Sequence, residues 1–393
     1  MLDIKYILNN KDLIIKNFKK RKFLFDFDNF EKVFFELKQV KFEYDQKKAE
    51  QNQIKVFNEE AKELKEIVNA LDFKKKNLEK KTNELLSELP NVIFENDKNA
   101  KDKEIFVSNH VLSKHNVTHD QIIKDLIMEN EASVLSGSRF VVLKKELSKL
   151  KNALVSFYKE INEKNGYEEY SVPYIVNSSS LYGTGQLPKF AEDAFNLNEK
   201  QWIISTGEIP LVNLWSDYIF NKEDLPKLMM TYSPCFRKEA GSAGKDTKGL
   251  IRLHQFHKVE LVTICLPENS EFFHKKQLNI ACEILQKLKL PYRILDVGAE
   301  EIGFSATKQY DIEVWMPAMN KYVEIASCSN CLDFQSRRAK IKYKDKELKK
   351  NFYVHTLNGS SLPVERLIAA IAENFYNHEK KTFEVPEVLK KYY

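Results

Sequence analysis

The sequence PCFRKEAGSAGKDTKGLIRLHQFHKVELV, residues Pro234 to Val262, decides the fold of this chain of 393 residues. It opens with an apolar run that ends at the charged triplet Arg237 to Glu239. Three glycines then space out a loop that is too flexible for a strand interior, and apolar alternation resumes between Leu250 and Val262. The pattern predicts a strand, a basic loop and a returning strand that pair as an antiparallel hairpin.

The side chains of this hairpin suit a nucleotide together with an amino acid. Arg237 offers a rigid fork of donors for a phosphate or a carboxylate, a charge-assisted pairing worth roughly 1.5–3 kcal/mol. Glu239 suits the exocyclic amine of adenine, the ring of Phe256 offers a stacking face worth about 1–3 kcal/mol, and Glu260 suits an ammonium or a hydroxyl. On paired strands such side chains converge. Composition alone favours the alternative, an ordinary hairpin with a charged tip.

Four segments of the chain resemble, in the same order, the motifs of one protein family. The segment FRKEAGSAGKDTKGLIRLHQFHKVE, residues 236–260, resembles motif 2 of class II aminoacyl-tRNA synthetases in the form found in seryl-tRNA synthetases. TGEIPL (206–211) resembles that family's serine loop, EIASCSN (324–330) resembles its EISSCSN strand, and the segment from LNGS (357–360) to Arg366 resembles its motif 3. Because four segments match motifs of one family in the same order, chance does not explain the resemblance.

The resemblance implies a fold and an activity. The fold class is α+β: an N-terminal antiparallel coiled-coil arm and a class II synthetase domain, which is an antiparallel sheet flanked by helices. The activity is that of a serine–tRNA ligase, which activates L-serine with ATP to seryl-adenylate and transfers the seryl group to the 3′ end of tRNA(Ser). Charging of tRNA(Sec) stays open. ATP is a co-substrate, Mg²⁺ is the expected cofactor, and the expected assembly is a homodimer.

The resemblance also implies the site residues. Those for ATP are Arg237, Lys238, Glu239, Leu253, Phe256, Glu324, Ile325, Ala326, Ser327 and Arg366, and Arg237 and Arg366 are the expected catalytic residues. Those for serine are Thr206, Gly207, Glu208, Arg237, Glu260 and Ser360. Glu324 and Ser327 supply hard oxygen ligands for Mg²⁺.

The chain departs from the family pattern at a few positions. Gly207 stands where Ala or Ser is usual and Ala326 where Ser is usual, and little effect is expected from either. Motif 3 departs more, because Ser361, Pro363 and Glu365 stand where relatives carry glycine, alanine and glycine. We expect a stiffer loop before Arg366.

The first ninety residues predict long helices, because no glycine precedes Gly137 and no proline precedes Pro90. Apolar residues recur at spacings of three and four along two seams. The first is Phe30, Val33, Leu37, Val40 and Tyr44; the second runs Phe57, Ala61, Leu64, Val68, Leu71, Leu78, Leu85 and Leu89, interrupted by Lys75 and Thr82. Residues 45–56 are mostly polar and predict the tip of a helical hairpin. The expected domains are 1–100, with a coiled-coil arm at about 28–89, and 101–393, the catalytic domain.

The resemblance assigns the arm to tRNA(Ser), which seryl-tRNA synthetases contact through its long variable arm and elbow. Lysines on the arm are nearly balanced by glutamates, so a solvated helix face is the alternative for any one of them. A firmer basic cluster lies at Lys16 to Lys22. Phosphate contacts there would make binding steeply salt dependent.

The larger domain has mixed patterning. Residues 140–164 have helical spacing that ends at Asn165-Gly166, and 170–176 predict an edge or interface strand because it contains Pro173. The resemblance identifies this helix and strand with motif 1, which builds the dimer interface of the family. Further strands are predicted near 201–205, 250–264, 310–316 and 321–327, and helices near 271–289 and 362–376. Neither GxGxxG nor GxxxxGK[ST] occurs, so no Rossmann or P-loop nucleotide site is indicated.

Composition sets broad limits. With 62 basic and 57 acidic side chains, the net charge of +5 requires any nucleic-acid site to come from local clustering. The five cysteines form no paired framework, and Cys328 and Cys331 make a single CxxC without the second ligand pair that zinc usually needs. No apolar run approaches the length of a signal or membrane segment, so a cytoplasmic, reduced protein is expected.

Two other functions remain open. A class II-like ligase that loads a carrier protein with a small amino acid is disfavoured by the long arm. A non-catalytic tRNA-binding homologue is disfavoured because the residues expected to handle ATP and serine are all present: Arg237, Glu239, Phe256, Glu260, Glu324 and Arg366.

Overall fold

The computed structural model describes residues 1–54, 59–93, 99–242 and 249–393. The chain divides into two compact units, Met1–Pro90 and Asn91–Tyr393. The division falls ten residues before the boundary predicted at 100/101, because the chain after Pro90 already belongs to the second unit. There the amide of Asn91 donates to the carbonyl oxygens of Ser305 and Cys331, each over 2.9 Å, and Thr307 donates to the carbonyl of Val92 over 2.7 Å.

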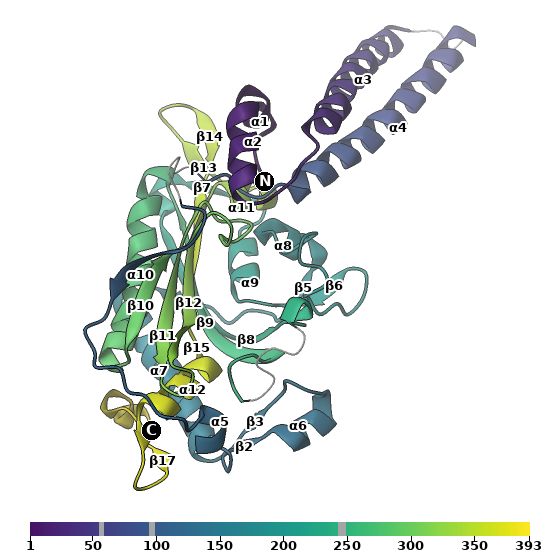
Figure 1. Ribbon diagram of the computed structural model, residues 1–393. Coiled ribbons are helices and arrows are strands. Elements are labelled where there is room, and N and C mark those ends of the chain that lie inside the picture. The colour runs from purple at the N-terminus through teal and green to yellow at the C-terminus, as the bar shows by residue number, and fades with distance from the viewer. Residues whose placement is uncertain (55–58, 94–98, 243–248) are drawn as a thin grey trace. The chain divides into compact units, whose positions relative to one another are not determined.

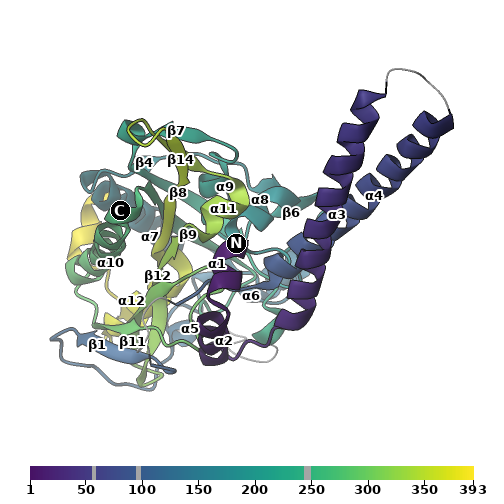
Figure 2. The ribbon, with the colours of Figure 1, turned by 90° about the horizontal axis from the view of Figure 1, so that it is seen from above.

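The first unit is entirely helical where it is described. Its helices are α1 (Ile4–Asn9), α2 (Lys11–Lys20), α3 (Phe27–Gln53) and α4 (Glu59–Glu88). Asp26 begins α3 as its N-cap, since its carboxylate accepts from the backbone N–H of Asn29 over 2.9 Å. Helices α3 and α4 lie side by side and run antiparallel (Figures 1 and 2), with Val33, Leu37, Val40 and Leu78 buried between them. The predicted pair of long helices with an apolar seam is confirmed.

The polar segment predicted as the tip is mostly helix. Helix α3 continues to Gln53, so residues 45–53 add turns to the helix rather than ending it. Lysine, glutamine and glutamate are good helix formers, and an ion pair three residues apart, Lys47 with Glu50 at 2.7 Å, fits a solvated helix surface. Residues 55–58, which include Phe57 of the predicted second seam, lie outside the described residues.

Both interruptions of the second seam are accommodated. Thr82 is buried, and its hydroxyl donates to the carbonyl of Leu78 in its own helix over 2.7 Å. Lys75 places its ammonium 3.5 Å from the ring centroid of Tyr44 and 2.8 Å from the carboxylate of Asp72. Across the two helices Lys41 pairs with Glu79 at 2.8 Å.

The second unit is built on a sheet in which eight of the described strands take part. In spatial order they are β1 (Lys103–Val107), β10 (Tyr292–Asp296), β11 (Lys308–Met316), β12 (Lys321–Leu332), β15 (His355–Pro363), β9 (Gln255–Cys265), β8 (Lys227–Phe236) and β4 (Glu168–Glu169). Neighbouring strands pair antiparallel, except that β4 pairs parallel with β8. The predicted antiparallel sheet is therefore confirmed apart from one short edge strand.

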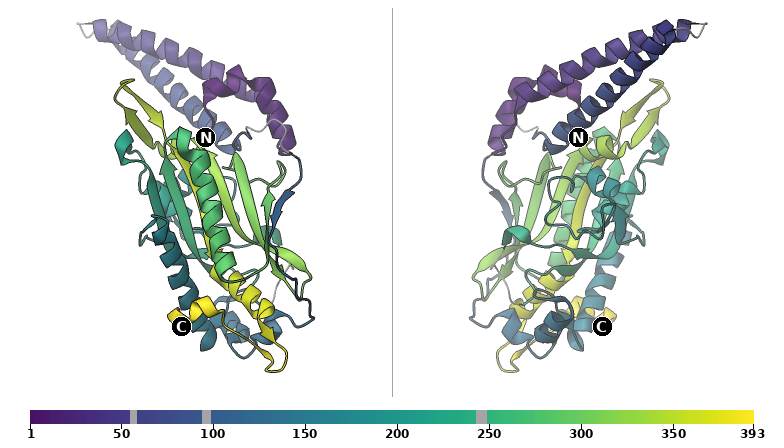
Figure 3. Two further views of the ribbon diagram at one scale, coloured as in Figure 1. Left: turned by 90° about the vertical axis from the view of Figure 1, so that its left-hand side faces the viewer. Right: turned by 90° about the vertical axis from the view of Figure 1, so that its right-hand side faces the viewer.

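Helices cover both faces of this sheet. The long helices α7 (Glu146–Lys164), α10 (Ser270–Lys287) and α12 (Val364–Asn374) share the main hydrophobic core with the strands, through side chains such as Leu154, Ile284 and Ile368. Figures 1 and 3 show α10 along one face, while α8 (Ser178–Thr184) and α9 (Glu208–Asn213) lie on the opposite face. The second face carries the site described below.

Short elements complete the unit. They are α5 (His119–Ile122), α6 (Glu129–Ser136), α11 (Phe334–Ala339), the pairs β2 (Ile127–Met128) with β3 (Val142–Leu143), β5 (Ile175–Asn177) with β6 (Gln201–Ile203) and β16 (Tyr376–Asn377) with β17 (Thr382–Phe383), and a three-stranded sheet of β7 (Ile219–Asn221), β13 (Lys342–Asp345) and β14 (Lys350–Tyr353). Short 3₁₀ helices lie at η1 (Lys222–Asp224), η2 (Ala240–Ser242), η3 (Pro267–Asn269) and η4 (Glu387–Tyr392). None of the helices in the described part of the chain combines the length and apolar character needed to cross a membrane.

Three predicted boundaries are corrected. The strand expected at 170–176 is broken, and only β4 and β5 on either side of it are paired, because proline cannot donate to a ladder and Pro173 stands between them. The hairpin has shorter strands than expected: β8 ends at Phe236, so Arg237 and Glu239 follow it, and β9 begins at Gln255 rather than Leu250. Of the predicted hairpin loop, residues 243–248 lie outside the described residues.

Replacing Leu78 with alanine is expected to lower the local stability of α4 by roughly 2–5 kcal/mol, because it opens a cavity between the two arm helices. Thr82→Val is the matched control: the hydroxyl it removes is satisfied within its own helix, so we expect a change below about 1 kcal/mol. Hydrogen exchange of the α4 amides in the intact protein measures both. Equal loss of protection in the two variants would contradict this account of the seam.

Candidate functional site

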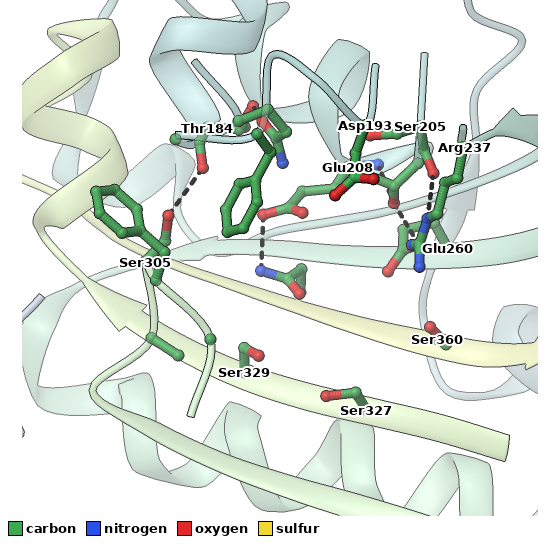
Figure 4. Close-up of a pocket in the computed structure, with 18 of the residues that line it drawn as sticks. Thr184, Asp193, Ser205, Glu208, Arg237, Glu260, Ser305, Ser327, Ser329 and Ser360 are labelled. Carbon is green, nitrogen blue, oxygen red and sulfur yellow. Dashed lines mark hydrogen bonds between the residues drawn. The ribbon is translucent and has the colours of Figure 1, made fainter. Parts of the chain in front are cut away.

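A cleft of about 690 Å³ lies on the sheet face that α8 and α9 cover. Its walls come from α8, the segment before α9, the end of the β8–β9 hairpin, and the neighbouring strands β12 and β15. Figure 4 shows the carboxylates of Glu208 and Glu260, the guanidinium of Arg237 and the hydroxyls of Ser327 and Ser360 around this space. Segments far apart in the sequence thus meet at one polar cavity.

A second cavity of about 260 Å³ adjoins the first. Both cavities are lined by Arg237, Glu239, Arg252, Lys258, Glu324 and Ser360, so these residues form the wall between them. The smaller cavity adds Leu250, Ile251, Leu253, Phe256, Ile325, Ala326, Pro363, Glu365 and Arg366. It therefore has an aromatic and aliphatic lining with arginines at its rim, which suits a base attached to phosphates.

Strand β9 supplies three side chains to these cavities by its period of two. Phe256, Lys258 and Glu260 point to the same face, and Lys258 and Glu260 are buried there as an ion pair. The ammonium of Lys258 also donates to the hydroxyls of Thr206 and Ser360, each over 3.2 Å. Thr206 in turn donates to the carboxylate of Glu260 over 2.8 Å, so the group forms a connected network.

Glu208 adds a second buried carboxylate beside this network. Gln335 and Asn358 donate to its Oε1 over 2.6 and 2.8 Å. Burial, and then the negative charge of Glu260, raise the pKa of Glu208 to about 7. The lining of the cleft holds Asp193, Glu208, Glu239, Glu260 and Glu324 against Arg237, Arg252 and Lys258, so its charge balance favours an added cation such as an amino group.

Arg237 stands at the wall between the cavities. It follows the end of β8, but its backbone N–H donates to the carbonyl of His254 over 2.9 Å, which continues the hairpin by one more pair. Its guanidinium donates to the carbonyl of Ser205 over 3.4 Å and lies 5.2 Å from the ring centroid of Phe256. Glu239, two residues further on, pairs with Arg252 at 2.7 Å.

Arg366 reaches the smaller cavity from the first turn of α12. Its guanidinium donates to the carbonyl oxygens of Glu324, over 2.5 Å, and Ile251, over 3.3 Å. Burial lowers the pKa of Arg366, and the charge of Glu324 acts in the opposite direction. A half-buried guanidinium held by carbonyl oxygens favours an anionic ligand beside it.

A bulge in β12 brings Glu324 and Ser327 to the same face. Residues three apart in a regular strand point to opposite faces, but the pairing with β11 shifts here: Ile312 faces Ala326, whereas Glu313 faces Glu324. Burial, and then the charge of Glu324, raise the pKa of Asp311 to about 7. In the part of the chain that the structure describes, no group of three or more acidic, histidine or cysteine side chains is arranged to hold a metal by itself. A divalent cation at Glu324 and Ser327 would take further oxygen ligands from a bound molecule, as Mg²⁺ commonly does.

The structure brings most of the predicted site residues to the two cavities. The larger is lined by Thr206, Glu208, Arg237, Glu239, Glu260, Glu324, Ser327 and Ser360, and the smaller by Arg237, Glu239, Leu253, Phe256, Glu324, Ile325, Ala326, Ser360 and Arg366. Gly207 and Lys238 line neither. The ammonium of Lys238 lies 5.8 Å from the ring centroid of Phe195, on the outer side of the segment.

Gly207 matters for packing rather than as a lining residue. A Cβ atom at this position would lie 2.5 Å from Cγ2 of Thr231 and 3.1 Å from Cβ of Glu260. The little effect expected for glycine in place of alanine or serine therefore does not hold in this chain, because the close approach of the segment to β8 requires glycine.

Sequence reasoning missed several residues that line the cavities or bond to residues that do. Lys258 was detectable, since it lies two residues from both Phe256 and Glu260 on a predicted strand. Gln335, which bonds Glu208 from α11, carried no sequence signal, and Arg252 pairs with Glu239 across a loop that has no periodicity. Asn358 lay within the motif 3 segment but had no role assigned to it.

Comparison with known proteins gives consistent results. The family model of the tRNA synthetase class II core domain (G, H, P, S and T) matches residues 191–375. The chain is similar to the serine–tRNA ligase of Hydrogenobaculum sp. (strain Y04AAS1), with 47% identity over 325 residues that cover 80% of this chain and 76% of the relative. It is also similar to that of Rippkaea orientalis, with 46% identity over 342 residues covering 85% and 80%. Among solved structures, the crystal structure of seryl-tRNA synthetase from Pyrococcus horikoshii complexed with ATP matches with a TM-score of 0.90 and 32% identity, covering 100% of this chain and 98% of the other.

Glu208 is expected to make the protein less stable as the pH rises. Its pKa of about 7 in the folded chain lies above the ordinary 4.5, so the folded state binds more protons than the unfolded state between these values and the free energy of unfolding falls through this window. Glu208→Gln keeps an oxygen that accepts from Gln335 and Asn358 but carries no charge. We expect it to make the slope shallower, leaving the part that the raised pKa of Asp311 contributes, and to be more stable than the wild type at pH 8 by an amount on the order of 3 kcal/mol.

Urea unfolding of both proteins at pH 5 and pH 8 measures this difference. Glu313→Gln, which removes a carboxylate that pairs with Arg293 on a strand of the same sheet but lines neither cavity, is the control and should keep the wild-type dependence on pH between 5 and 8. An unchanged slope in Glu208→Gln would contradict the assignment.

Proposed function

We propose how this site works for a chain that belongs to the serine–tRNA ligase family of class II aminoacyl-tRNA synthetases. It is an ATP-dependent ligase that joins serine to tRNA, and ATP, serine and tRNA are its partners. The alternatives, a carrier-protein ligase and a non-catalytic tRNA-binding homologue, are not favoured, because relatives that cover most of the chain are serine–tRNA ligases.

The charge balance of the larger cleft carries the proposal for serine. Glu208 and Glu260 would hold the α-ammonium of serine, since the acidic side chains in the lining of the cleft, Asp193, Glu208, Glu239, Glu260 and Glu324, outnumber the basic ones, Arg237, Arg252 and Lys258. Arg237, at the border with the smaller cavity, would take the carboxylate of serine and so point it toward ATP. An ammonium beside Glu208 would also lower the raised pKa of that carboxyl.

Hydroxyl recognition falls to Thr206 and Ser360. Both are bonded to Lys258 and border the same space. Buried polar groups arranged for a substrate hydroxyl reject the analogue that lacks it, so alanine is discriminated strongly. Threonine differs by one methyl group and is excluded by lack of room, which is the weaker discriminator.

The smaller cavity would bind ATP. The ring of Phe256 would stack on the adenine, with Leu253, Ile325 and Ala326 packing around it. Glu239 would accept from the adenine amino group. Arg237 would contact the α-phosphate and Arg366 the γ-phosphate of a bent ATP, a role supported by the two carbonyl oxygens that hold the Arg366 guanidinium at this cavity.

Glu324 and Ser327 would hold a Mg²⁺ ion beside the phosphates of ATP. The bulge in β12 turns both oxygen ligands to the cleft, and Glu324 lines both cavities. When bound, the ion would neutralise phosphate charge and orient the leaving pyrophosphate. Lys238, which lines neither cavity, has no place in this proposal.

The two half-reactions follow from this arrangement. The serine carboxylate attacks the α-phosphorus of ATP, pyrophosphate leaves, and the fixed guanidinium of Arg237 stabilises the charge that builds on the α-phosphate. The terminal ribose hydroxyl of tRNA then attacks the carbonyl carbon of seryl-adenylate, and AMP leaves. Throughout, Glu260 and Glu208 keep the amino group in place.

The first unit is proposed to bind tRNA(Ser) through the arm formed by α3 and α4. Its surface carries many exposed lysines, among them Lys38, Lys62 and Lys80. The exposed lysines Lys16, Lys19 and Lys22 extend the basic surface at the end of α2. Contacts of this kind are made to phosphates and weaken with salt.

A homodimer is the proposed assembly. Pro173, Tyr174 and Ile175 are consecutive exposed residues in the segment that follows α7, and α7 and this segment together resemble the family's interface motif. A second copy would cover this apolar segment. The proposed location is the cytoplasm, where the five free, buried cysteines would stay reduced.

Arg237→Ala is expected to lower serine-dependent ATP–pyrophosphate exchange roughly 100-fold or more, because it removes the fixed cation at the α-phosphate. Arg293→Ala is the matched control, since Arg293 pairs with Glu104 and Glu313 and lines neither cavity. The control should exchange at the wild-type rate. Undiminished exchange in Arg237→Ala would refute its role.

Replacing residues 28–88 with a short Gly/Ser linker should separate the two activities. Serine-dependent exchange is expected to persist, because the site lies within the second unit. Charging of tRNA(Ser), measured with radiolabelled serine, should fall by about 100-fold or more through lost phosphate contacts. Charging at the wild-type rate would rule out tRNA binding by the arm.

A further inference from the structure

Glu365 is a buried carboxylate that binds one residue of β9 twice. It lies in the first turn of α12 and is only 3% exposed. Its Oε2 accepts from the backbone N–H of His257 over 2.7 Å, and its Oε1 lies 2.6 Å from Nδ1 of the same residue. A side chain from one element thus fixes both the backbone and the ring of a residue in another.

These bonds occur where a strand neighbour of β9 ends. The pairing of β15 with β9 shifts between Ser360 and Pro363, and Pro363, which faces Lys258, is the last residue of the strand. Helix α12 begins at the next residue. The carboxylate of Glu365 therefore accepts from the backbone N–H of His257, the residue of β9 just beyond the last pair with β15.

The imidazole of His257 has a defined tautomer. The ammonium of Lys151, on α7, lies 3.3 Å from Nε2, and an ammonium can only donate. Nε2 is therefore the acceptor, and Nδ1 carries the proton that it donates to Glu365. The ring of Tyr232 stacks on the imidazole with centroids 5.7 Å apart and an interplanar angle of 21°. His257 is held from three directions.

His257 separates two residues that face the cavities. Phe256, proposed to stack on adenine, precedes it, and Lys258, the ammonium among the serine-facing groups, follows it. Successive side chains of a strand point to opposite faces, so fixing His257 on one face fixes its two neighbours on the other. Arg366 follows Glu365 directly, so the same turn of α12 also carries a proposed phosphate ligand.

We infer that Glu365 is a positioning residue: through His257 it holds Phe256 and Lys258 where ATP and serine require them. The inference rests on the proposed roles of those two residues. Position 365 is one of the departures of this chain from motif 3, and the contact with His257 gives that departure a function.

Kinetics of ATP–pyrophosphate exchange test the inference. Glu365→Gln should lower kcat/KM for both ATP and serine by roughly 10- to 100-fold, because the carboxamide cannot accept from both N–H groups of His257. His257→Ala should match it, and His257→Asn, whose amide can still donate to Glu365, should stay within about threefold of the wild type. The double variant Glu365→Gln/His257→Ala should be no worse than either single variant, since the residues act as a unit.

A purely structural role makes a different prediction. Asp345→Asn changes another buried carboxylate, which accepts from the backbone N–H groups of Glu347 and Leu348 and lines neither cavity. It should lower the melting temperature without changing either KM. If Glu365→Gln behaves in the same way, with lower stability and unchanged KM values, the inference is overturned.

Two further measurements separate this inference from the proposed function. Phe256→Ala should raise the KM for ATP about tenfold or more through lost stacking; no change would refute the ATP assignment and the inference together. A raised KM in Phe256→Ala with unchanged kinetics in Glu365→Gln would refute only the positioning role. In Glu365→Ala the amide of His257 should exchange hydrogen faster than in the wild type, and unchanged protection of the peptide 255–260 would also overturn it.

Discussion

The pairing of β8 with β9 is the interaction on which the rest of the site depends. The two strands pair without a break from Lys227 opposite Ile264 to Phe236 opposite Gln255. That register places Phe256, Lys258 and Glu260 on one face, and the pair of Arg237 with His254 extends it beyond the end of β8. A shift of the register by one residue would turn every one of the β9 side chains away from the cavities.

Charges near this hairpin are arranged at some cost in stability. The network of Glu208, Glu260 and Lys258 places two carboxylates and one ammonium in a buried space. The raised pKa of Glu208 shows that its charged form is unfavourable there. The protein offsets this cost in the core shared by α7, α10 and α12 with the opposite face of the sheet, where Leu147, Ile284 and many similar side chains are fully buried. One face of the sheet thus stabilises the fold while the other keeps charges fixed for the substrates.

Periodicity in the sequence predicted regular elements and failed where they are irregular. The seam from Val33 to Val40, the end of α7 at Asn165 and the alternation of β9 all follow from spacing, because each lies in a regular helix or strand. Residues 45–53 are helical although the sequence predicts a tip there. The prediction uses the spacing of apolar residues, and a solvent-exposed stretch of helix has no such spacing. Most of the predicted site residues line the cavities, but these came from family resemblance and not from spacing. Contacts such as Gln335 with Glu208 join segments more than a hundred residues apart, which no local pattern encodes.

A second group of site residues lies where strand pairing is interrupted. The bulge between Ile312 and Glu313 turns Glu324 and Ser327 to one face, and the shift between Ser360 and Pro363 leaves room for the turn of α12 that carries Glu365 and Arg366. In an unbroken ladder, Glu324 and Ser327 would point to opposite faces of the sheet. A β15 that stayed paired with β9 would also occupy the place from which the side chains of α12 reach β9. The regular part of the sheet therefore sets the frame, and its interruptions aim the groups that act on ATP. The same interruption explains the importance of position 365 in this chain. β15 no longer pairs with β9 at His257, and the carboxylate of Glu365 on α12 binds the backbone and the ring of His257 instead.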